Sequence, residues 1–486
     1  MKQIIGLDIG TNSVKAIIIG NGNIIDQKSV GYNPDYPSSG CVEQSPDVWW
    51  NAVKEAIKAL TEANPGDVVA ISASGQMHSS VFLDRDGNVI RKAILWNDTR
   101  TSQQVAEINQ VVGGEAKLLN MVYNRALEGF TLPKILWLRT NEPDNFAQVA
   151  KVVMPKDYVN FKLTGRIATD VSDAAGTMLF DVAKGQWSSG LIEKVGINAD
   201  ILPEVLESID IVGNVLPELA AELGLSENTL VIAGGADNSC AAIGNGAIEA
   251  GQTIISIGTS GTVVTMLDKV PAHITGDVHM FNYSYPNSYY AMGCMLCAGE
   301  SLNWLRDIVA IKDFEAFNVL AERSKPGAGG VVFLPYLFGE RCPWPNPAAR
   351  GVFFGLSNTT SKEDMVRAVM EGVAFNLRAM YDLIEPFTKI KEIYITGGGA
   401  KSHIWGQIIA DVLGRQMQVL NIEEGPAFGA ALIAGVGAKV FSNFAEAKAQ
   451  FLKTNRIIEP TARDIYAKQF KVFKKLYEVN QCLFAE

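Results

Sequence analysis

The chain has 486 residues, more than one hydrophobic core usually serves, so we expect two domains. Hydrophobic residues make up 48% and charged residues 19%, which is typical of a globular protein. The net charge of −10 argues against a nucleic-acid partner, and no uncharged apolar run is long enough to span a membrane. Six scattered cysteines suit a reducing compartment, and we interpret the pair Cys294 and Cys297 as core residues. We therefore predict a cytoplasmic protein.

Residues 3–31 predict three short antiparallel strands, with Asn21-Gly22 as the turn between the second and third. Asp8 interrupts the apolar pattern of the first strand, and a buried carboxylate is costly unless it is paired or binds a cation. Two interpretations stay open. Asp8 forms a salt bridge to Lys15, or it faces a cleft and holds Mg²⁺, usually through water.

Polar residues follow the next apolar segments in the same way. A helix over residues 46–63 precedes a strand over 67–74, after which comes His78. The segment 93–100 then supplies Trp96 and Asn97. An aromatic ring beside short polar groups suits a polyol, which needs an apolar wall and several hydrogen bonds. A structural role for His78 and core packing for Trp96 are the alternatives.

Helical and loop signals fill residues 125–185, which we expect to roof the same cleft. We predict a helical or loop insertion over 188–228. An apolar run at 230–233 then predicts a buried strand, which two glycines end before Asp237. Ligands of open α/β sheets bind outside the carboxyl ends of strands, so Asp237 is a candidate catalytic group. An ordinary N-cap is the alternative.

The second half repeats a unit of the first. Residues 251–267 and residues 4–19 both show an apolar strand, Ile-Gly-Thr, a short turn with serine and a second apolar strand. Backbone N–H groups and hydroxyls at two such turns can hold phosphates. Neither turn is a Walker loop or a dinucleotide-binding GxGxxG loop. Matching turns therefore suggest one phosphate ligand shared by two domains.

Four later segments, and Arg341 before them, carry further signals. Ser361 begins a capping box that predicts a helix to about Ile384, and residues 392–414 show a strand, three glycines and a helix, where a nucleoside could lie. Residues 425–435 predict a small-residue helix that lets another element pack closely, and 461–484 predict an amphipathic helix. For Arg341 we favour a structural ion pair over a phosphate contact.

The motifs, taken together and in order, resemble those of the FGGY carbohydrate kinases, most closely the bacterial xylulokinase branch. They are DIGTNSVKA, GQMH, LWND, PKDY, SDAAGTM, AGGADN, SIGTSG, GERCP, RGVFFGL and TGGGAKS. The resemblance covers nearly the whole chain. It implies an α/β, two-domain duplicated fold of the sugar kinase–actin–Hsp70 (ribonuclease H-like) type, with the active site in an interdomain cleft. We expect an N-terminal domain over 1–246 and a C-terminal domain over 247–486.

The resemblance also implies roles for particular residues. Asp237 would be the general base, Asp8 would serve the Mg-ATP site, and both would lie at the metal. The implied sugar contacts are Gln76, Met77, His78, Trp96, Asn97 and Asn238. The implied ATP contacts are Thr11, Asn12, Ser13 and Lys15 in the first turn, Gly258, Thr259 and Ser260 in the second, and Gly398, Gly399 and Ser402 at the adenosine.

The implied reaction is ATP-dependent phosphorylation of D-xylulose to D-xylulose 5-phosphate, with ATP, Mg²⁺ and a ketose as ligands and a homodimer left open. We expect the pKa of Asp237 to stay near its usual range, because a base must be ionised at neutral pH. Ser79 stands where many xylulokinases carry glycine, which bears on the choice of sugar. The alternatives are an FGGY kinase for ribulose, gluconate or a hexulose, and a non-catalytic ATP switch protein of the actin or Hsp70 type.

Overall fold

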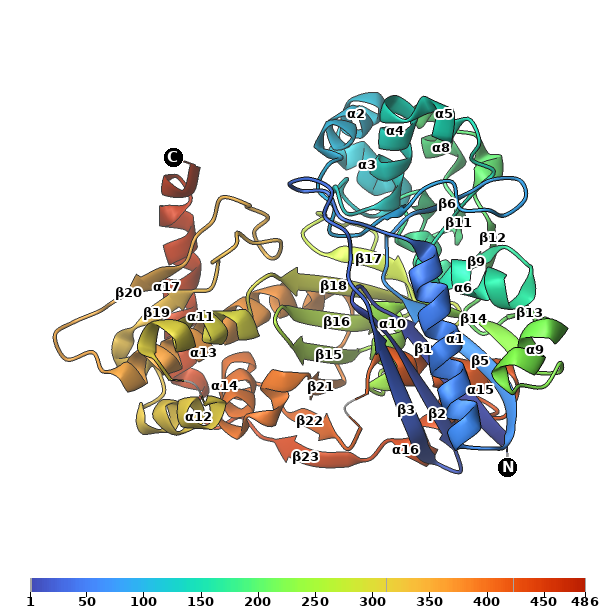
Figure 1. Ribbon diagram of the computed structural model, residues 1–486. Coiled ribbons are helices and arrows are strands. Elements are labelled where there is room, and N and C mark those ends of the chain that lie inside the picture. The colour runs from blue at the N-terminus through green and yellow to red at the C-terminus, as the bar shows by residue number, and fades with distance from the viewer. Residues whose placement is uncertain (1, 312, 423, 486) are drawn as a thin grey trace.

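The computed structural model describes residues 2–311, 313–422 and 424–485. Its two large sheets stand next to each other (Figure 1). In the described part of the chain the first sheet has the order β13 (Ile211–Asn214), β14 (Leu230–Ala236), β5 (Asp67–Gly75), β1 (Lys2–Ile9), β2 (Ser13–Gly20) and β3 (Asn23–Gly31). The second has the order β17 (His279–Asn282), β18 (Tyr289–Met295), β16 (Gly261–Leu267), β15 (Gln252–Ile257), β21 (Glu392–Thr396), β22 (Met417–Leu420) and β23 (Thr454–Ile458).

The second sheet repeats the topology of the first. Strand β1 pairs antiparallel with β2 and parallel with β5, and β15 pairs in the same two ways with β16 and β21. Each sheet continues with another parallel strand, β14 or β22, and ends in an antiparallel edge strand, β13 or β23. The internal repeat is therefore confirmed as a duplicated α/β unit.

The helices fall into four groups. Against the first sheet lie α1 (Pro46–Ala63), α6 (Pro155–Thr164) and α9 (Pro217–Leu223). Above it stand α2 (Ser102–Val112), α3 (Glu115–Val122), α4 (Thr131–Asn141), α5 (Pro143–Phe146) and α8 (Ser189–Val195) (Figure 1). The middle group is α7 (Val171–Ala175), α10 (Asp237–Gly244), α15 (Pro426–Gly437) and α16 (Phe444–Phe451). The second sheet carries α11 (Gly299–Val309), α12 (Phe314–Arg323), α13 (Lys362–Ile384), α14 (His403–Leu413) and α17 (Arg463–Asn480).

Short elements connect these parts. The short strands are β4 (Glu43–Gln44), β6 (Val81–Leu83), β7 (Ala93–Ile94), β8 (Lys151–Val153), β9 (Ala168–Asp170), β10 (Phe180–Asp181), β11 (Gln186–Trp187), β12 (Glu204–Leu206), β19 (Val332–Leu334) and β20 (Val352–Phe354). The 3₁₀ turns are η1 (Ala199–Ile201), η2 (Ala328–Gly330), η3 (Glu385–Phe387), η4 (Gly398–Lys401) and η5 (Leu483–Ala485). No helix among the described residues is both long and apolar enough to cross a membrane.

Alternation along β1 decides which way its carboxylate points. Ile5, Leu7 and Ile9 are buried in the core that includes α1, and successive side chains of a strand face opposite sides. Asp8 therefore shares the opposite face with Gly6, which packs against α15. A Cβ on Gly6 would lie 2.0 Å from the carbonyl oxygen of Ala427, so only glycine permits this contact. Asp8 thus faces the middle of the molecule.

Helix α15 is the small-residue helix predicted over 425–435, and it packs closely as expected. A Cβ on its Gly429 would lie 1.8 Å from the carbonyl oxygen of Cys240 in α10. Although it follows the second sheet in sequence, α15 packs against β1 and β5 of the first sheet. A helix of the second half therefore packs on the sheet of the first, and the boundary at residue 246 stays a prediction.

Residues 188–228 differ from the prediction of helices and loops alone. They contain α8 and α9, but also β12, which pairs parallel with β9, and β13, which pairs antiparallel with β14. Strand β13 has only four residues and an irregular register at Ile211 and Gly213, too short for a period-two pattern. It forms because β14 would otherwise present an unpaired sheet edge.

The capping box at Ser361 is confirmed. The Ser361 hydroxyl accepts the backbone N–H of Asp364 at 3.2 Å, and the Asp364 carboxylate accepts the backbone N–H of Ser361 at 3.0 Å. Helix α13 then runs to Ile384, as predicted. Local side-chain chemistry therefore sets where this helix begins.

Candidate active site

The predicted polar segments meet at the carboxyl ends of neighbouring strands in the first sheet. Strands β1, β5 and β14 run parallel, and their last residues Ile9, Gly75 and Ala236 lie in register. The first turn, the GQMH segment and Asp237 leave the sheet directly after these residues. The structure thus brings together groups that are far apart in sequence at the strand ends where α/β sheets bind ligands.

Asp237 is the first residue of α10, and Ala236 is the N-cap, so the ordinary N-cap interpretation of Asp237 is wrong. Its Oδ1 accepts hydrogen bonds from the backbone N–H and the side-chain amide of Asn238, at 2.7 and 2.9 Å. Burial, and then the nearby charge of Asp8, raise the pKa of Asp237 to about 7. The expectation of a nearly unshifted pKa is therefore wrong, because sequence does not reveal desolvation.

Burial also raises the pKa of Asp8, to about 6. The predicted alternative, a salt bridge from Asp8 to Lys15, is wrong. Lys15 lies opposite Asp8 on β2, but its Nζ pairs with Glu424, just before α15. The ammonium group thereby ties the two halves together and leaves the Asp8 carboxylate without a described ion-pair partner.

The first turn is tied to Gln76 and Trp96, two of the predicted sugar contacts, by a closed chain of hydrogen bonds. Gln76 donates its side-chain amide to the carbonyl oxygen of Gly10 at 3.2 Å, and its Oε1 accepts the Ser79 hydroxyl at 2.9 Å. The Ser79 oxygen accepts the backbone N–H of Trp96 at 3.0 Å. The Trp96 indole returns to the turn, donating to the Thr11 hydroxyl at 3.0 Å. Ser79, the departure from the family pattern, is thus a link in this ring.

Backbone bonds complete the first turn. Gly10 donates its N–H to the carbonyl oxygen of Ser13 at 3.0 Å, and Tyr32 bonds to the carbonyl oxygens of Gly10 and Asn12 at 2.7 and 2.8 Å. Within the described chain, the N–H groups of Thr11 and Asn12 donate to no partner. Adjacent unpaired N–H groups in a turn form an anion-binding site.

The second turn has the same design but different supports. Gly258 donates its N–H to the carbonyl oxygen of Ser260 at 2.9 Å. The start of α11 then holds the turn, since Ala298 and Gly299 donate to the carbonyl oxygens of Thr259 and Gly258, both at 2.9 Å. As in the first turn, the N–H groups of Thr259 and Ser260 have no described partner.

A cavity of about 490 Å³ is lined by both halves of the chain, and we name it the sugar-side cavity after the predicted sugar contacts in its lining. His78 lines it in a left-handed conformation with φ of 67°, which costs a residue with a Cβ free energy and is typical of functional sites. Its Nδ1 lies 2.5 Å from the carbonyl oxygen of Gly176, and Phe130 packs against the ring. Burial lowers the pKa of His78 to about 3, so the ring is neutral and Nε2 is left as an acceptor.

The remaining sugar-side predictions divide into two groups. Trp96 and Asn97 line the cavity, and the buried Oδ1 of Asn97 has no hydrogen-bond partner in the described chain. Gln76 acts within the ring described above. Met77 is buried, with its Sδ 3.8 Å from the Asn238 amide nitrogen and 3.7 Å from the Tyr290 hydroxyl. Met77 therefore supports Asn238, the neighbour of Asp237.

We name a second cavity, of about 550 Å³, the nucleotide-side cavity after the predicted ATP contacts in its lining. It is lined by five predicted residues: Gly258, Thr259, Gly398, Gly399 and Ser402. A Cβ on Gly399 would lie 2.4 Å from the Ile257 side chain, so the glycine loop lies directly over β15. The Ser402 hydroxyl donates to Asn318 at 2.6 Å and accepts the N–H of Trp405 at 3.1 Å, which caps α14.

Several second-half residues that line the two cavities were not among the predicted ligand contacts. The sugar-side cavity also contains His279, Glu340 and Arg341, and the nucleotide-side cavity contains Asn303, Glu315, Asn318 and Trp405. The ion pair favoured for Arg341 is absent from those formed among the described residues. The motif GERCP was the available signal for Arg341, but only the fold places it opposite His78.

Comparisons with known proteins agree with this arrangement. Models of the N-terminal and C-terminal domains of the FGGY family of carbohydrate kinases match residues 3–244 and 253–438. A xylulose kinase of Staphylococcus xylosus is 39% identical over 484 residues, covering 98% of this chain and 100% of the relative. A ligand-bound xylulose kinase of Lactobacillus acidophilus has a TM-score of 0.95 at 28% identity, covering 100% and 99% of the two chains.

A gluconate kinase of Lactobacillus acidophilus is similar to the same extent, with a TM-score of 0.93 at 27% identity and coverage of 99% and 98%. The backbone fold is thus shared by kinases named for different sugars. The two matching family models and the nearly full-length similarity show that this chain belongs to the FGGY family of carbohydrate kinases.

Proposed function

We propose that the protein transfers the terminal phosphoryl group of ATP to O5 of D-xylulose, giving ADP and D-xylulose 5-phosphate. The observation that carries this proposal is the position of Asp237, whose carboxylate follows directly after β14, where β1, β5 and β14 end in register. The name of the Staphylococcus relative, xylulose kinase, supports the choice of sugar.

The two turns supply the phosphate contacts in this proposal. The nucleoside would lie in the nucleotide-side cavity against Gly398 and Gly399, with its phosphates directed at the unpaired N–H groups of the two turns. Phosphoryl transfer depends mainly on positioning and charge stabilisation, which preorganised N–H groups provide. Lys15 would join them once it leaves Glu424.

Asp237 would accept the proton of the attacking hydroxyl. A pKa of about 7 is close to the optimum for a general base, because such a group is substantially ionised at neutral pH and still a good proton acceptor. The two hydrogen bonds from Asn238 fix Oδ1, which leaves Oδ2 to receive the proton.

Asp8 and Asp237 also suit Mg²⁺. They are oxygen donors close enough that one raises the pKa of the other, and Mg²⁺ commonly takes one or two carboxylates together with phosphates and water. No cluster of three metal-binding side chains occurs among the described residues, which fits an ion shared with the nucleotide rather than held by protein alone. When bound, Mg²⁺ neutralises charge on the phosphates.

The sugar would bind in the first cavity. The neutral His78 ring offers Nε2, and Asn97 offers its unpaired Oδ1, as acceptors for two hydroxyl groups. Trp96 supplies the apolar wall, while its N–H groups remain committed to Ser79 and Thr11. A site that hydrogen-bonds hydroxyl groups discriminates strongly against sugars that lack them.

One observation favours a second candidate substrate. Arg341 lines the sugar-side cavity without an ion-pair partner in the described chain, and a guanidinium there could pair with the carboxylate of gluconate. A sugar panel ranked by kcat/KM in a coupled ADP assay tests both. We expect D-xylulose to rank first; a first rank for gluconate would replace it, and sugar-independent turnover would favour an ATP switch protein.

The remaining parts of the proposal concern the setting of the reaction. We place it in the cytoplasm, supported by free cysteines at all six positions in the structure. A homodimer stays a prediction.

A further inference from the structure

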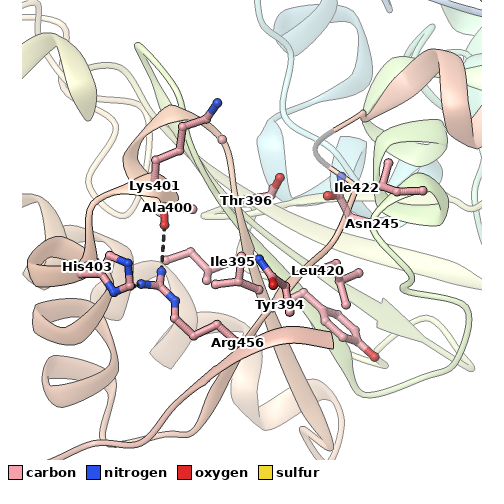
Figure 2. Close-up of a pocket in the computed structure, with 13 residues that line it drawn as sticks. Asn245, Tyr394, Ile395, Thr396, Ala400, Lys401, His403, Leu420, Ile422 and Arg456 are labelled. Atoms are coloured by element: carbon pink, nitrogen blue, oxygen red, sulfur yellow. Dashed lines mark hydrogen bonds between the residues drawn. The ribbon is translucent and has the colours of Figure 1, made fainter. Parts of the chain in front are cut away.

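A third cavity, of about 450 Å³, lies outside both sites described above (Figure 2). It opens at the carboxyl ends of the parallel strands β21 and β22, the usual position of ligand sites in α/β sheets. Asn245, the C-cap of α10, lies on one side, while Arg456 and His403 lie on the other. Its volume suits a small metabolite.

The lining combines an apolar floor with a basic rim. Aliphatic side chains form the floor: Ile395, Val419, Leu420 and Ile422. Arg456 supplies the basic group of the rim, with the His403 ring beside it. The chain has 52 acidic and 42 basic residues, yet none of the described lining residues carries a carboxylate. The guanidinium of Arg456 makes an oxyanion a suitable ligand for this cavity.

Arg456 is held so that it can receive such an anion. One guanidinium nitrogen donates to the carbonyl oxygen of Ala400 at 3.0 Å, and the other terminal nitrogen contacts His403 Nδ1 (Figure 2). A guanidinium has five N–H donors, so three remain beyond these two contacts. Val419 lies directly opposite Arg456 in the β22–β23 pair, which places the apolar floor beside the charge.

We propose that this cavity binds a small amphipathic anion, with a phosphate, sulfonate or carboxylate group at Arg456 and an apolar body on the floor formed by Val419 and its neighbours. A planar, preorganised guanidinium binds such oxyanions well. A fully polar sugar phosphate would make no apolar contacts with the aliphatic side chains of the floor, so the apolar body is part of the proposal.

The cavity is also placed to influence nucleotide binding. Gly397, Ala400 and Lys401 line it, while Gly398, Gly399, Lys401 and Ser402 line the nucleotide-side cavity. One loop thus forms a wall of both. An anion that fixes this loop should change ADP affinity, and by thermodynamic reciprocity ADP should change the affinity for the anion equally.

The test uses anilinonaphthalenesulfonate, a fluorescent sulfonate with an apolar body, titrated into the full chain saturated with ADP. We expect one bound probe that ADP does not displace. Arg456→Gln should weaken its binding by roughly tenfold or more, as expected for loss of a charge-assisted hydrogen bond. The control Lys475→Gln removes an exposed positive charge on α17 and should leave binding unchanged.

A second variant keeps the experiment informative if Arg456→Gln disturbs the loop. Val419→Trp fills the floor but retains Arg456, and it should abolish probe binding. Uncharged phenylnaphthylamine, which lacks the sulfonate, should bind equally to the wild type and to Arg456→Gln. Full displacement of the sulfonate by ADP, or unchanged binding in Val419→Trp, would overturn the site.

Coupling is measured with the same proteins by titrating ADP into samples with and without saturating probe. We expect saturating probe to change the Kd for ADP by about fivefold or more in the wild type and not in Val419→Trp. Equal ADP affinity with and without the probe in the wild type would overturn the proposed communication between the two cavities.

Discussion

The two hairpin turns occupy equivalent places in a duplicated fold, yet they differ in the carboxylate beside them and in the groups that hold them. Asp8 stands two residues before Gly10, and Ser256 stands two residues before Gly258, so only the first hairpin carries a carboxylate. Side chains from the sugar side hold the first turn, whereas backbone N–H groups of α11 hold the second. Both halves thus share the backbone of the turn, whereas a carboxylate two residues before its glycine occurs in the first hairpin alone.

This difference has a consequence for mutagenesis. The first turn shares hydrogen bonds with Trp96 and Gln76, so disturbing it should affect both substrates. The second turn contacts the nucleotide-side cavity, so disturbing it should affect ATP alone. The largest effects should come from the carboxylates of the first half.

The largest expected effect is that of Asp237→Ala. Loss of the general base should lower kcat by at least ~10⁴, the upper end for such catalysis, while ATP and sugar still bind. Rapid-quench turnover and calorimetric binding measure the two separately. Asp86→Ala, in an exposed loop, is the control. Near-normal kcat in Asp237→Ala would remove this residue from the chemistry.

The pH profile should show the coupling of the two carboxylates. Because a base must be ionised and the pKa of Asp237 is about 7, kcat/KM should fall about tenfold per pH unit below that value. Asp8→Asn removes the neighbouring negative charge, so the pKa of Asp237 should fall. The midpoint of the pH profile of the remaining activity should therefore lie at lower pH than in the wild type. Ser256→Ala should leave the midpoint unchanged. A midpoint that does not move in Asp8→Asn would contradict the coupling.

Gly299→Ala should separate the two turns. The new Cβ would lie 2.5 Å from the carbonyl oxygen of Gly258 and push the second turn out of place. An overpacking cost of about 1–3 kcal/mol should raise the KM for ATP roughly tenfold and leave the ketose KM unchanged. Gly31→Ala, near the first turn but with no atom closer than 3.9 Å, is the matched control. Equal changes in both KM values would contradict the division of labour.

Ser79→Ala should have the smallest effect on the kinetic constants. Unlike Gly299→Ala, it should change the KM values of both substrates. It leaves Gln76 Oε1 and the Trp96 N–H without partners, which costs folding stability about 1–3 kcal/mol for each buried group. Initial-rate kinetics should show both KM values rising several-fold, with kcat little changed. Ser102→Ala, at the exposed start of α2, controls for loss of a hydroxyl. A rise in the KM for the ketose alone would mean that the hydrogen-bonded ring does not influence the first turn.

Much of this molecule follows from local sequence. The hairpins of both halves, α1, the capping box of α13 and the strand–glycine–helix at 392–414 appear where the sequence predicts them. Apolar periodicity, turn residues and caps act within a few residues, so the chain itself encodes them. The matching Ile-Gly-Thr turns likewise revealed the duplication, and family motifs indicated the residues of the candidate site.

Tertiary structure alone decided the rest. Lys15 pairs with Glu424, 409 residues away, and not with its cross-strand neighbour Asp8. Strand β13 forms because β14 would otherwise have an unpaired edge. Burial beside another carboxylate, not the sequence around it, raised the pKa of Asp237. Arg341 reached the sugar-side cavity through the packing of the two halves. These outcomes depend on desolvation and long-range pairing, which arise only when distant segments come together.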